Sequence, residues 1–238
     1  MLESWRGRRT VLKRLLFALV LLLGLALLAD RFLVSAAQDA AGRQVRSVLR
    51  TPRDAEVTIA GFPFLTQALG GRLRQVDVVA RGVPVEGLTL QRVDASLTGV
   101  RLEVGKALAG EIEGVPADTA TATARLTYED LNAYLRRRGS LVVSASGGTL
   151  SVAGQVRVKG AQFAGKGQAA LVLRPGSIVL QVTSASADGV ALPAAATRLL
   201  TVTVPTRGLP FGMSLQRVEI GQDALILRGA ATGIFLSP

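Results

Sequence analysis

Few residues in this chain have the chemistry that enzymes use. Its 238 residues include no cysteine and no histidine, which removes thiol catalysis, the commonest general base and the commonest transition-metal ligand. A serine nucleophile would need a lysine base, and Lys106, Lys159 and Lys166 lie in Gly/Ala-rich contexts. Glu111 and Glu113 lie between glycines, which is typical of an exposed turn rather than an acid/base pair. We therefore expect no enzyme activity, no cofactor and no metal site.

The charge balance instead indicates an anionic partner. The formal net charge is +11, which favours nucleic acid, an anionic membrane surface or an acidic glycolipid. A nucleic-acid binder would interleave basic and aromatic side chains, but the arginines here are dispersed and the only tryptophan, Trp5, precedes a long apolar run. Calcium-loop spacing, a phosphate-binding Gly-Lys-Ser/Thr motif and a dinucleotide fingerprint are also missing from the sequence. We expect anionic phospholipid and membrane, and no nucleic acid, as partners.

The most distinctive apolar stretch lies between residues 57 and 71. It opens with a short β-branched segment, breaks at Gly61, and continues with Phe62 and Phe64 on either side of Pro63. The chain has only seven phenylalanines, so this pair is a local concentration. Pro63 fixes its own φ and pushes Phe62 toward an extended conformation, which sets the directions of the two rings. The rings either pack an ordinary core or line a ligand cavity, and core packing is the commoner fate of large apolar residues.

This stretch resembles a known family. The Gly-Phe-Pro-Phe-Leu sequence at 61–65, together with Gln67, Gly71 and a later Leu-Pro-Phe-Gly-Met segment at 209–213, is similar to the actinobacterial LmeA-type phospholipid-binding proteins, which are implicated in lipomannan elongation. The resemblance covers most of the chain after about Arg43, and its motifs are apolar and glycine positions without a catalytic signature. It implies a lipid pocket similar in kind to that of the tubular lipid-binding (TULIP) domains.

We predict that acyl chains are buried by six apolar side chains, each buried methylene contributing about 0.8 kcal/mol. These residues are Phe62, Phe64, Leu65, Leu69, Phe211 and Met213. The candidates for the phosphate end are Arg81 and Arg207, which come from the sequence alone and not from the family. They occupy equivalent places in two similar segments, 81–94 and 207–219, although a solvated turn arginine is the simpler interpretation of each one.

The two similar segments also predict a strand shape. In both, the apolar alternation changes phase, because Leu88 and Leu90 are followed by Val93, and Leu215 by Val218. A phase change within a strand indicates a bulge or a strong bend. We interpret the similarity as two related β units that curve around one core.

The N-terminal region predicts export. Residues 1–14 carry five basic side chains against one glutamate, and an unbroken apolar run follows at 15–29, so the N-terminus should be cytoplasmic and the rest extracytoplasmic. The run is short for a bilayer span, but Phe32 and its neighbours extend it if Arg31 snorkels. Small residues at 35–37 offer a cleavage site that is distant from the run. We favour a retained anchor over 15–34, with cleavage and release as the alternative.

The remaining chain shows helical and then strand periodicity. Apolar residues recur at helical spacing up to Arg50, in a stripe made shallow by alanines, and we interpret 35–51 as a stalk helix packed on the domain; a helix on the membrane surface is the alternative. Alternation of period two follows, for example at 149–158, with turn dipeptides such as Gly147-Gly148. Two helices interrupt it. One is capped by Thr127, carries an apolar stripe from Tyr128 to Leu135 and ends at Gly139, and the other starts at Pro193.

These observations predict an α+β, β-rich fold: an N-terminal membrane helix followed, over 52–238, by a curved antiparallel sheet wrapped around short helices, TULIP-like in architecture. The predicted function is a membrane-anchored extracytoplasmic phospholipid binder that supports envelope lipid or lipomannan-type glycolipid biosynthesis or transport. The alternatives are a ligand-free envelope scaffold and a tethered regulatory subunit of a glycosyltransferase. An internal cavity favours lipid binding, whereas a filled core with an exposed apolar patch favours the partner functions.

Overall fold

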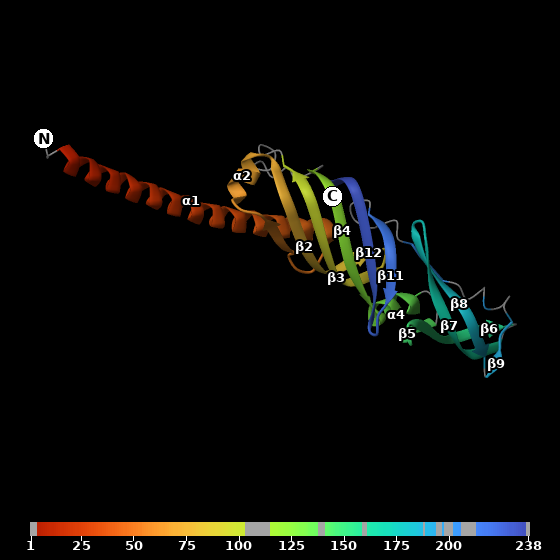
Figure 1. Cartoon of the computed structure of the whole chain (residues 1–238). Coiled ribbons are helices and arrows are strands. Elements are labelled where there is room, and N and C mark those ends of the chain that lie inside the picture. Colours follow the sequence, from red (N-terminus) through yellow and green to blue (C-terminus); the bar gives the residue numbers. More distant parts are fainter. Residues whose placement is uncertain are drawn as a thin grey trace.

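A computed structural model of the chain describes residues 4–102, 115–137, 141–158, 161–187, 189–193, 197, 202–205 and 213–236. Figure 1 shows an elongated molecule in which a long helix, a first sheet and a second sheet follow one another, with the N-terminus at one end and β9 at the other. The fold is β-rich α+β with antiparallel sheets, as predicted, and it is compatible with a TULIP-like architecture.

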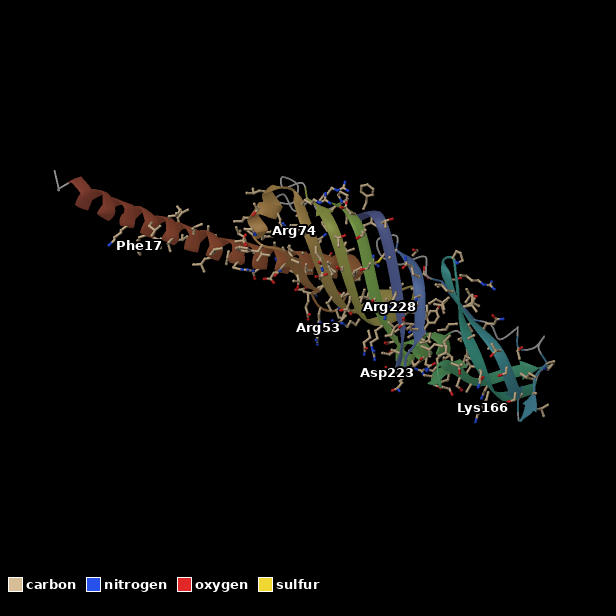
Figure 2. All side chains as sticks on the ribbon, viewed as in Figure 1. Phe17, Arg53, Arg74, Lys166, Asp223 and Arg228 are labelled. Atoms are coloured by element: carbon tan, nitrogen blue, oxygen red, sulfur yellow. The ribbon has the colours of Figure 1, made fainter. Side chains whose placement is uncertain are left out.

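The first element is a single helix, α1 (Ser4–Leu49), of 46 residues. The segments that the sequence separates into tail, anchor and stalk are therefore continuous in structure. The part from Leu16 is long and apolar enough to cross a membrane, a property that signal sequences near an N-terminus share. Its first half projects away from the sheets, as the exposed Phe17 illustrates (Figure 2). The helix ends where Arg50 takes a positive φ of 53° and the Thr51 N–H bonds the Arg46 carbonyl at 3.2 Å.

Six strands form the first sheet, which we call sheet A. They are β1 (Glu56–Ala60), β2 (Arg72–Val85), β3 (Leu88–Arg101), β4 (Val115–Thr127), β11 (Ser214–Ile220) and β12 (Ala224–Leu236), in the order β1-β2-β3-β4-β12-β11. Every described pairing is antiparallel. A short helix, α2 (Phe64–Leu69), connects β1 to β2. Sheet A curves over the C-terminal half of α1, so the helix that it wraps is the end of the long helix rather than a short one (Figure 1).

The curvature has a local origin that the sequence indicated. Ala80 and Val83 of β2 face the same interior as Val93 and Leu90 of β3. These residues pair as Ala80 with Val93 and Val83 with Leu90, so both strands change phase together while the register holds, and Gly82 supplies a φ of 66° at the bend. The second similar segment behaves differently, because β11 has a register shift between Leu215 and Arg217. The predicted phase changes are thus a shared bend in one segment and a bulge in the other.

The chain leaves sheet A after β4, builds a second sheet, and returns for β11 and β12. We call the second sheet sheet B; its strands are β5 (Leu141–Ser146), β6 (Thr149–Val158), β7 (Ala161–Arg174), β8 (Ser177–Ala187), β9 (Val190–Ala191) and β10 (Val202–Pro205). The order is β10-β8-β7-β6-β5, and β9 pairs with β8. The predicted turn glycines adopt positive φ, at 56° and 81° for Gly147 and Gly148 and at 72° for Gly176.

Helix α4 (Tyr128–Arg136) lies between the two sheets. As predicted, Thr127 caps it: the Thr127 Oγ1 accepts a hydrogen bond from the Asp130 N–H at 3.1 Å. Asn132 links the helix to β5 through two hydrogen bonds, donating to the Val143 carbonyl at 2.9 Å and accepting from the Val143 N–H at 2.7 Å. The apolar residues of α4, with those of both sheets, form a closely packed cluster that we call the junction core. Its most central members include Val83, Leu126, Tyr128, Leu131, Tyr134, Leu135, Val143, Leu150 and Leu180.

Two features predicted from the sequence lie wholly or mostly outside the described residues. The first is Gly139, the glycine expected to end α4, which is not among the described residues. Of the helix predicted from Pro193, only Pro193 and Thr197 are described in its first five positions, and the Thr197 N–H bonds the Pro193 carbonyl at 3.2 Å, the i to i−4 spacing of an α-helix.

Candidate functional site

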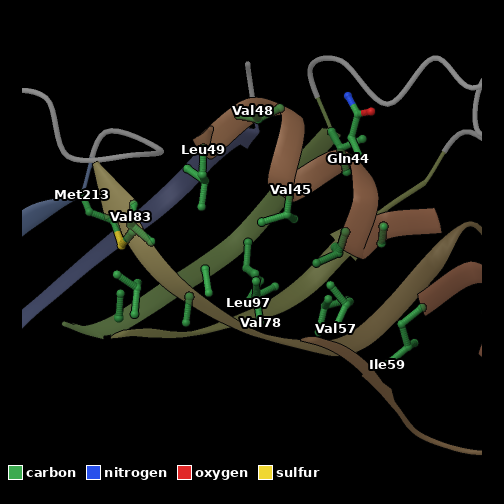
Figure 3. A pocket seen from close by; sticks show the side chains of 18 of the residues that line it. Gln44, Val45, Val48, Leu49, Val57, Ile59, Val78, Val83, Leu97 and Met213 are labelled. Atoms are coloured by element: carbon green, nitrogen blue, oxygen red, sulfur yellow. The ribbon is translucent and has the colours of Figure 1, made fainter. Parts of the chain in front are cut away.

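An apolar cavity of about 380 Å³ lies between the C-terminal half of α1 and the concave face of sheet A. Figure 3 shows Val45 and Leu49 of α1 pointing toward Val78 and Leu97 on the strands. The volume is within the range of about 300–1,000 Å³ found for ligand pockets. The lining residues of α1 are Ala37, Ala40, Ala41, Gln44, Val45, Val48 and Leu49, and those of the strands include Val57, Ile59, Leu73, Val76, Val78, Ala80, Val83, Leu90, Val93, Ala95, Leu97 and Leu227.

The cavity exists because the helix presents small side chains to the sheet. Ala37, Ala40 and Ala41 each place only a methyl group toward the strands. The end of the helix is held close to β1 by Gly42, where a Cβ would lie 2.4 Å from the Ala55 carbonyl oxygen, and the Ala55 N–H donates to the Gly42 carbonyl at 3.2 Å. With its end held against the sheet and its inner face formed by methyl groups, α1 leaves empty space between them.

The chemistry of the lining suits hydrocarbon. Among the described residues that line the cavity, Gln44 is the only one with a polar side chain, and that side chain is exposed and points away from the cavity in Figure 3. No charged side chain occurs among these lining residues. A polar ligand that entered the cavity would lose its hydrogen bonds to water without replacing them. An alkyl chain has no such hydrogen bonds to lose and gains by leaving water. The described lining can therefore hold apolar chains and contributes no acid, base or nucleophile.

Most of the described arginines on sheet A are engaged with carboxylates outside the cavity. Arg81 of β2 donates to Glu56 at 2.6 Å, and that hydrogen bond, with the charge of Arg81, lowers the pKa of Glu56. Asp118 of β4 binds both Arg72 and Arg101, and its pKa is lowered, chiefly by the hydrogen bond from Arg101. These pairs at the surface link different strands of sheet A, and each contributes little to stability.

The predicted site residues do not form one group. Phe64 and Met213 line the cavity. Phe62 and Leu69 do not; their exposed fractions are 50% and 76%. Leu65 is half-buried beside α1, where its N–H donates to Asp30 at 2.7 Å.

Of the two arginine candidates for the phosphate end, only Arg81 lies among the described residues. Arg81 is half-exposed and paired with Glu56, and it does not line the cavity. Arg207 lies outside the described residues, as does Phe211. Contact of any of these residues with a lipid stays a prediction.

Sequence reasoning missed the contribution of α1 to the site. The sequence analysis interprets its apolar stripe as the packing face of a stalk helix and names no residue of the strands among the candidates for lipid contact. The available signal was the mismatch in size, since a helix face of alanines cannot fill the concave side of a curved sheet.

Comparisons with known proteins agree with the geometry. A family model described as LmeA-like phospholipid-binding matches residues 28–230, which is most of the chain and includes the covering half of α1 and the whole of the described cavity lining. No curated protein and no solved structure matches the chain.

Proposed function

This chain belongs to the LmeA-like phospholipid-binding family, and from that premise we propose that the cavity under α1 holds the acyl chains of a phospholipid. The observation that carries the proposal is the lining, in which every side chain that the structure describes, apart from that of Gln44, is apolar. Each methylene moved from water into such a lining contributes about 0.8 kcal/mol, so the acyl chains would provide most of the affinity.

The head group would remain outside the lining and close to water. Gln44 and Ala40 are exposed lining residues on the same side of α1, which makes this edge of the helix our candidate for the exit of the acyl chains toward the head group. We propose an anionic head group because the chain carries a net charge of +11. Arg207 remains a candidate for the phosphate, whereas Arg81 already has Glu56 as its partner.

We further propose that the lipid is bound and not converted, because no catalytic constellation occurs in the sequence. In this proposal residues 1–14 are cytoplasmic, 15–34 anchor the protein in the membrane, 35–51 are the stalk helix that covers the cavity, and 52–238 are an extracytoplasmic lipid-binding domain. The biological role would be support of envelope lipid or lipomannan-type glycolipid synthesis or transport, as the family resemblance implies. A glycosyltransferase would then be a candidate partner in the envelope.

The test is native mass spectrometry of the full chain, released from detergent micelles after expression in a bacterial membrane. We expect about one phospholipid per chain, with anionic species enriched over the host membrane composition. The matched variants are Ala41→Trp, which places an indole inside the cavity, and Ser47→Trp, which places it on the exposed face of the same helix. Ala41→Trp should lose most of the bound lipid, and Ser47→Trp should retain it.

Two results would contradict the proposal. A chain that stays free of lipid after incubation with anionic vesicles would favour the ligand-free scaffold or the regulatory subunit. Equal lipid loss in both tryptophan variants would place the lipid somewhere other than under α1.

A further inference from the structure

Helix α2 is fastened to α1 at the level where the apolar run of α1 ends. The run stops at Ala29, and the next residue, Asp30, accepts a hydrogen bond from the Leu65 N–H of α2 at 2.7 Å. The Arg31 guanidinium lies over the Phe62 ring, 5.2 Å from its centroid. One turn further along, Val34 and Phe64 belong to the same buried cluster.

These contacts determine the height of α2 relative to a bilayer. A helix rises about 1.5 Å per residue, so Asp30 to Val34 lie within about 8 Å of the end of the apolar run. If 15–34 span the membrane, then α2 and the turn before it lie at the outer boundary between acyl chains and head groups. Figure 1 shows α2 beside α1 where the helix reaches sheet A.

Asp30 itself supports this placement. A carboxylate next to the hydrocarbon region is costly unless it is shielded and hydrogen-bonded. Asp30 is 2% exposed and its Oδ1 accepts a hydrogen bond from the backbone of α2, so the protein shields the carboxylate and supplies a hydrogen-bond donor to it. The same hydrogen bond satisfies one of the free N–H groups at the start of α2.

The surface that α2 presents is apolar. Residues 61–71 contain no charged side chain. Phe62 before α2 and Leu69 at its end are 50% and 76% exposed, and Phe32 on the adjoining part of α1 is 74% exposed. Cations flank the segment: Arg31 precedes Phe32, and Arg74 lies exposed near the start of β2 (Figure 2). Exposed apolar residues with arginines at their border are typical of segments that lie in the membrane interface.

We propose that the segment Gly61–Gly71 docks into the outer leaflet of the lipid bilayer that α1 crosses, with Phe62 and Leu69 among the upper acyl carbons and Arg31 at the phosphates. Phe64, in the middle of the segment, lines the cavity, so docking brings one end of the cavity to the bilayer surface where phospholipid is available. The proposal rests on the membrane-anchored function above and adds the bilayer itself as the partner of α2.

The experiment uses the full chain in vesicles of phosphatidylcholine and phosphatidylglycerol, with Trp5→Phe removing the only native tryptophan. Leu69→Trp reports on α2. Val190→Trp is the matched control, because Val190 is also apolar and 70% exposed but lies in β9, at the end of the molecule opposite the helix. With lipids brominated on their acyl chains, Leu69→Trp should show a blue-shifted emission and lose most of its fluorescence, while Val190→Trp should lose none.

A second measurement distinguishes a failure of membrane docking from a failure of the proposed cavity function. Leu69→Asp should slow the loading of lipid from vesicles into delipidated protein, followed by native mass spectrometry, whereas Val190→Asp should not. Unquenched Leu69→Trp in a chain that still carries lipid would overturn docking and leave the cavity function intact. Quenched Leu69→Trp in a chain that never carries lipid would uphold docking and reject the cavity function.

Discussion

Helices α4 and α1 both lie against strands, but α4 completes a core whereas α1 leaves a cavity. α4 presents Tyr128, Leu131, Tyr134 and Leu135, which are all buried in the junction core, and none of the four lines the cavity. α1 presents alanines and valines to the concave face of sheet A, and a cavity of about 380 Å³ remains. Both faces are apolar and both have helical periodicity. The difference is side-chain volume, which decides whether a helix on a sheet completes a core or covers a binding site.

The comparison can be tested most strongly by removing one leucine from each region. Leu150→Ala in the junction core should cost about 3–5 kcal/mol, because this fully buried side chain is surrounded by other side chains. Leu73→Ala in the cavity wall should cost about 2 kcal/mol in the lipid-free protein, because part of its surface already faces empty space. Urea unfolding in detergent, followed by circular dichroism of the strands, measures both. Equal costs would mean that the cavity wall is packed as tightly as the junction core.

Adding volume should rank the two regions in the same order. Leu131→Trp on α4 should destabilise the lipid-free protein by about 1–3 kcal/mol, since Leu131 is buried among the other side chains of the junction core. Ala41→Trp on α1 should leave the stability unchanged or raise it, since the indole enters existing space. Thermal unfolding of the delipidated variants gives the comparison. A lower melting temperature for Ala41→Trp, similar to that of Leu131→Trp, would contradict the presence of a cavity.

The smallest expected effect concerns the polar rim of the junction core. The Tyr128 hydroxyl donates to the Gly221 carbonyl at 2.9 Å, and burial, with the charge of Asp223, raises the pKa of Tyr128. Because the folded-state pKa is raised, this contribution is fully present below the unfolded pKa of about 10 and is lost as the pH rises through the folded-state value. Tyr128→Phe should cost about 1 kcal/mol at neutral pH and flatten the alkaline part of the stability profile. An unchanged profile would argue against the burial of this hydroxyl.

Much of the fold follows from short-range signals. The cap at Thr127, the buried stripe from Tyr128 to Leu135, the glycine turns of sheet B and the phase change between Leu90 and Val93 are each specified by a few neighbouring residues, and the structure confirms them. Local conformational preference and periodicity are sufficient for such features. They are not sufficient to show that the strands divide into two sheets.

The candidate site could be predicted only in part, because a cavity is a property of surfaces that meet from distant segments. The Phe-Pro-Phe motif drew attention to Phe62 and Phe64 together, yet the structure buries Phe64 at the cavity and leaves Phe62 exposed. Which ring faces inward depends on how α2 packs on Asp30 and Val34, some thirty residues earlier in the chain. Arg81 appeared equivalent to Arg207, but its pairing with Glu56 across β1 and β2 is a tertiary fact.

The unbroken course of α1 has a consequence for transport. The helix is about 69 Å long at 1.5 Å per residue and carries both the proposed anchor and the cover of the cavity. A lipid held under it would stay at a constant height above one membrane and could not diffuse away through the aqueous phase. Its encounters with acceptors would be a two-dimensional search, limited by lateral diffusion and by the surface density of the protein. The rate of delivery should therefore scale with copies per area of membrane and not with bulk concentration.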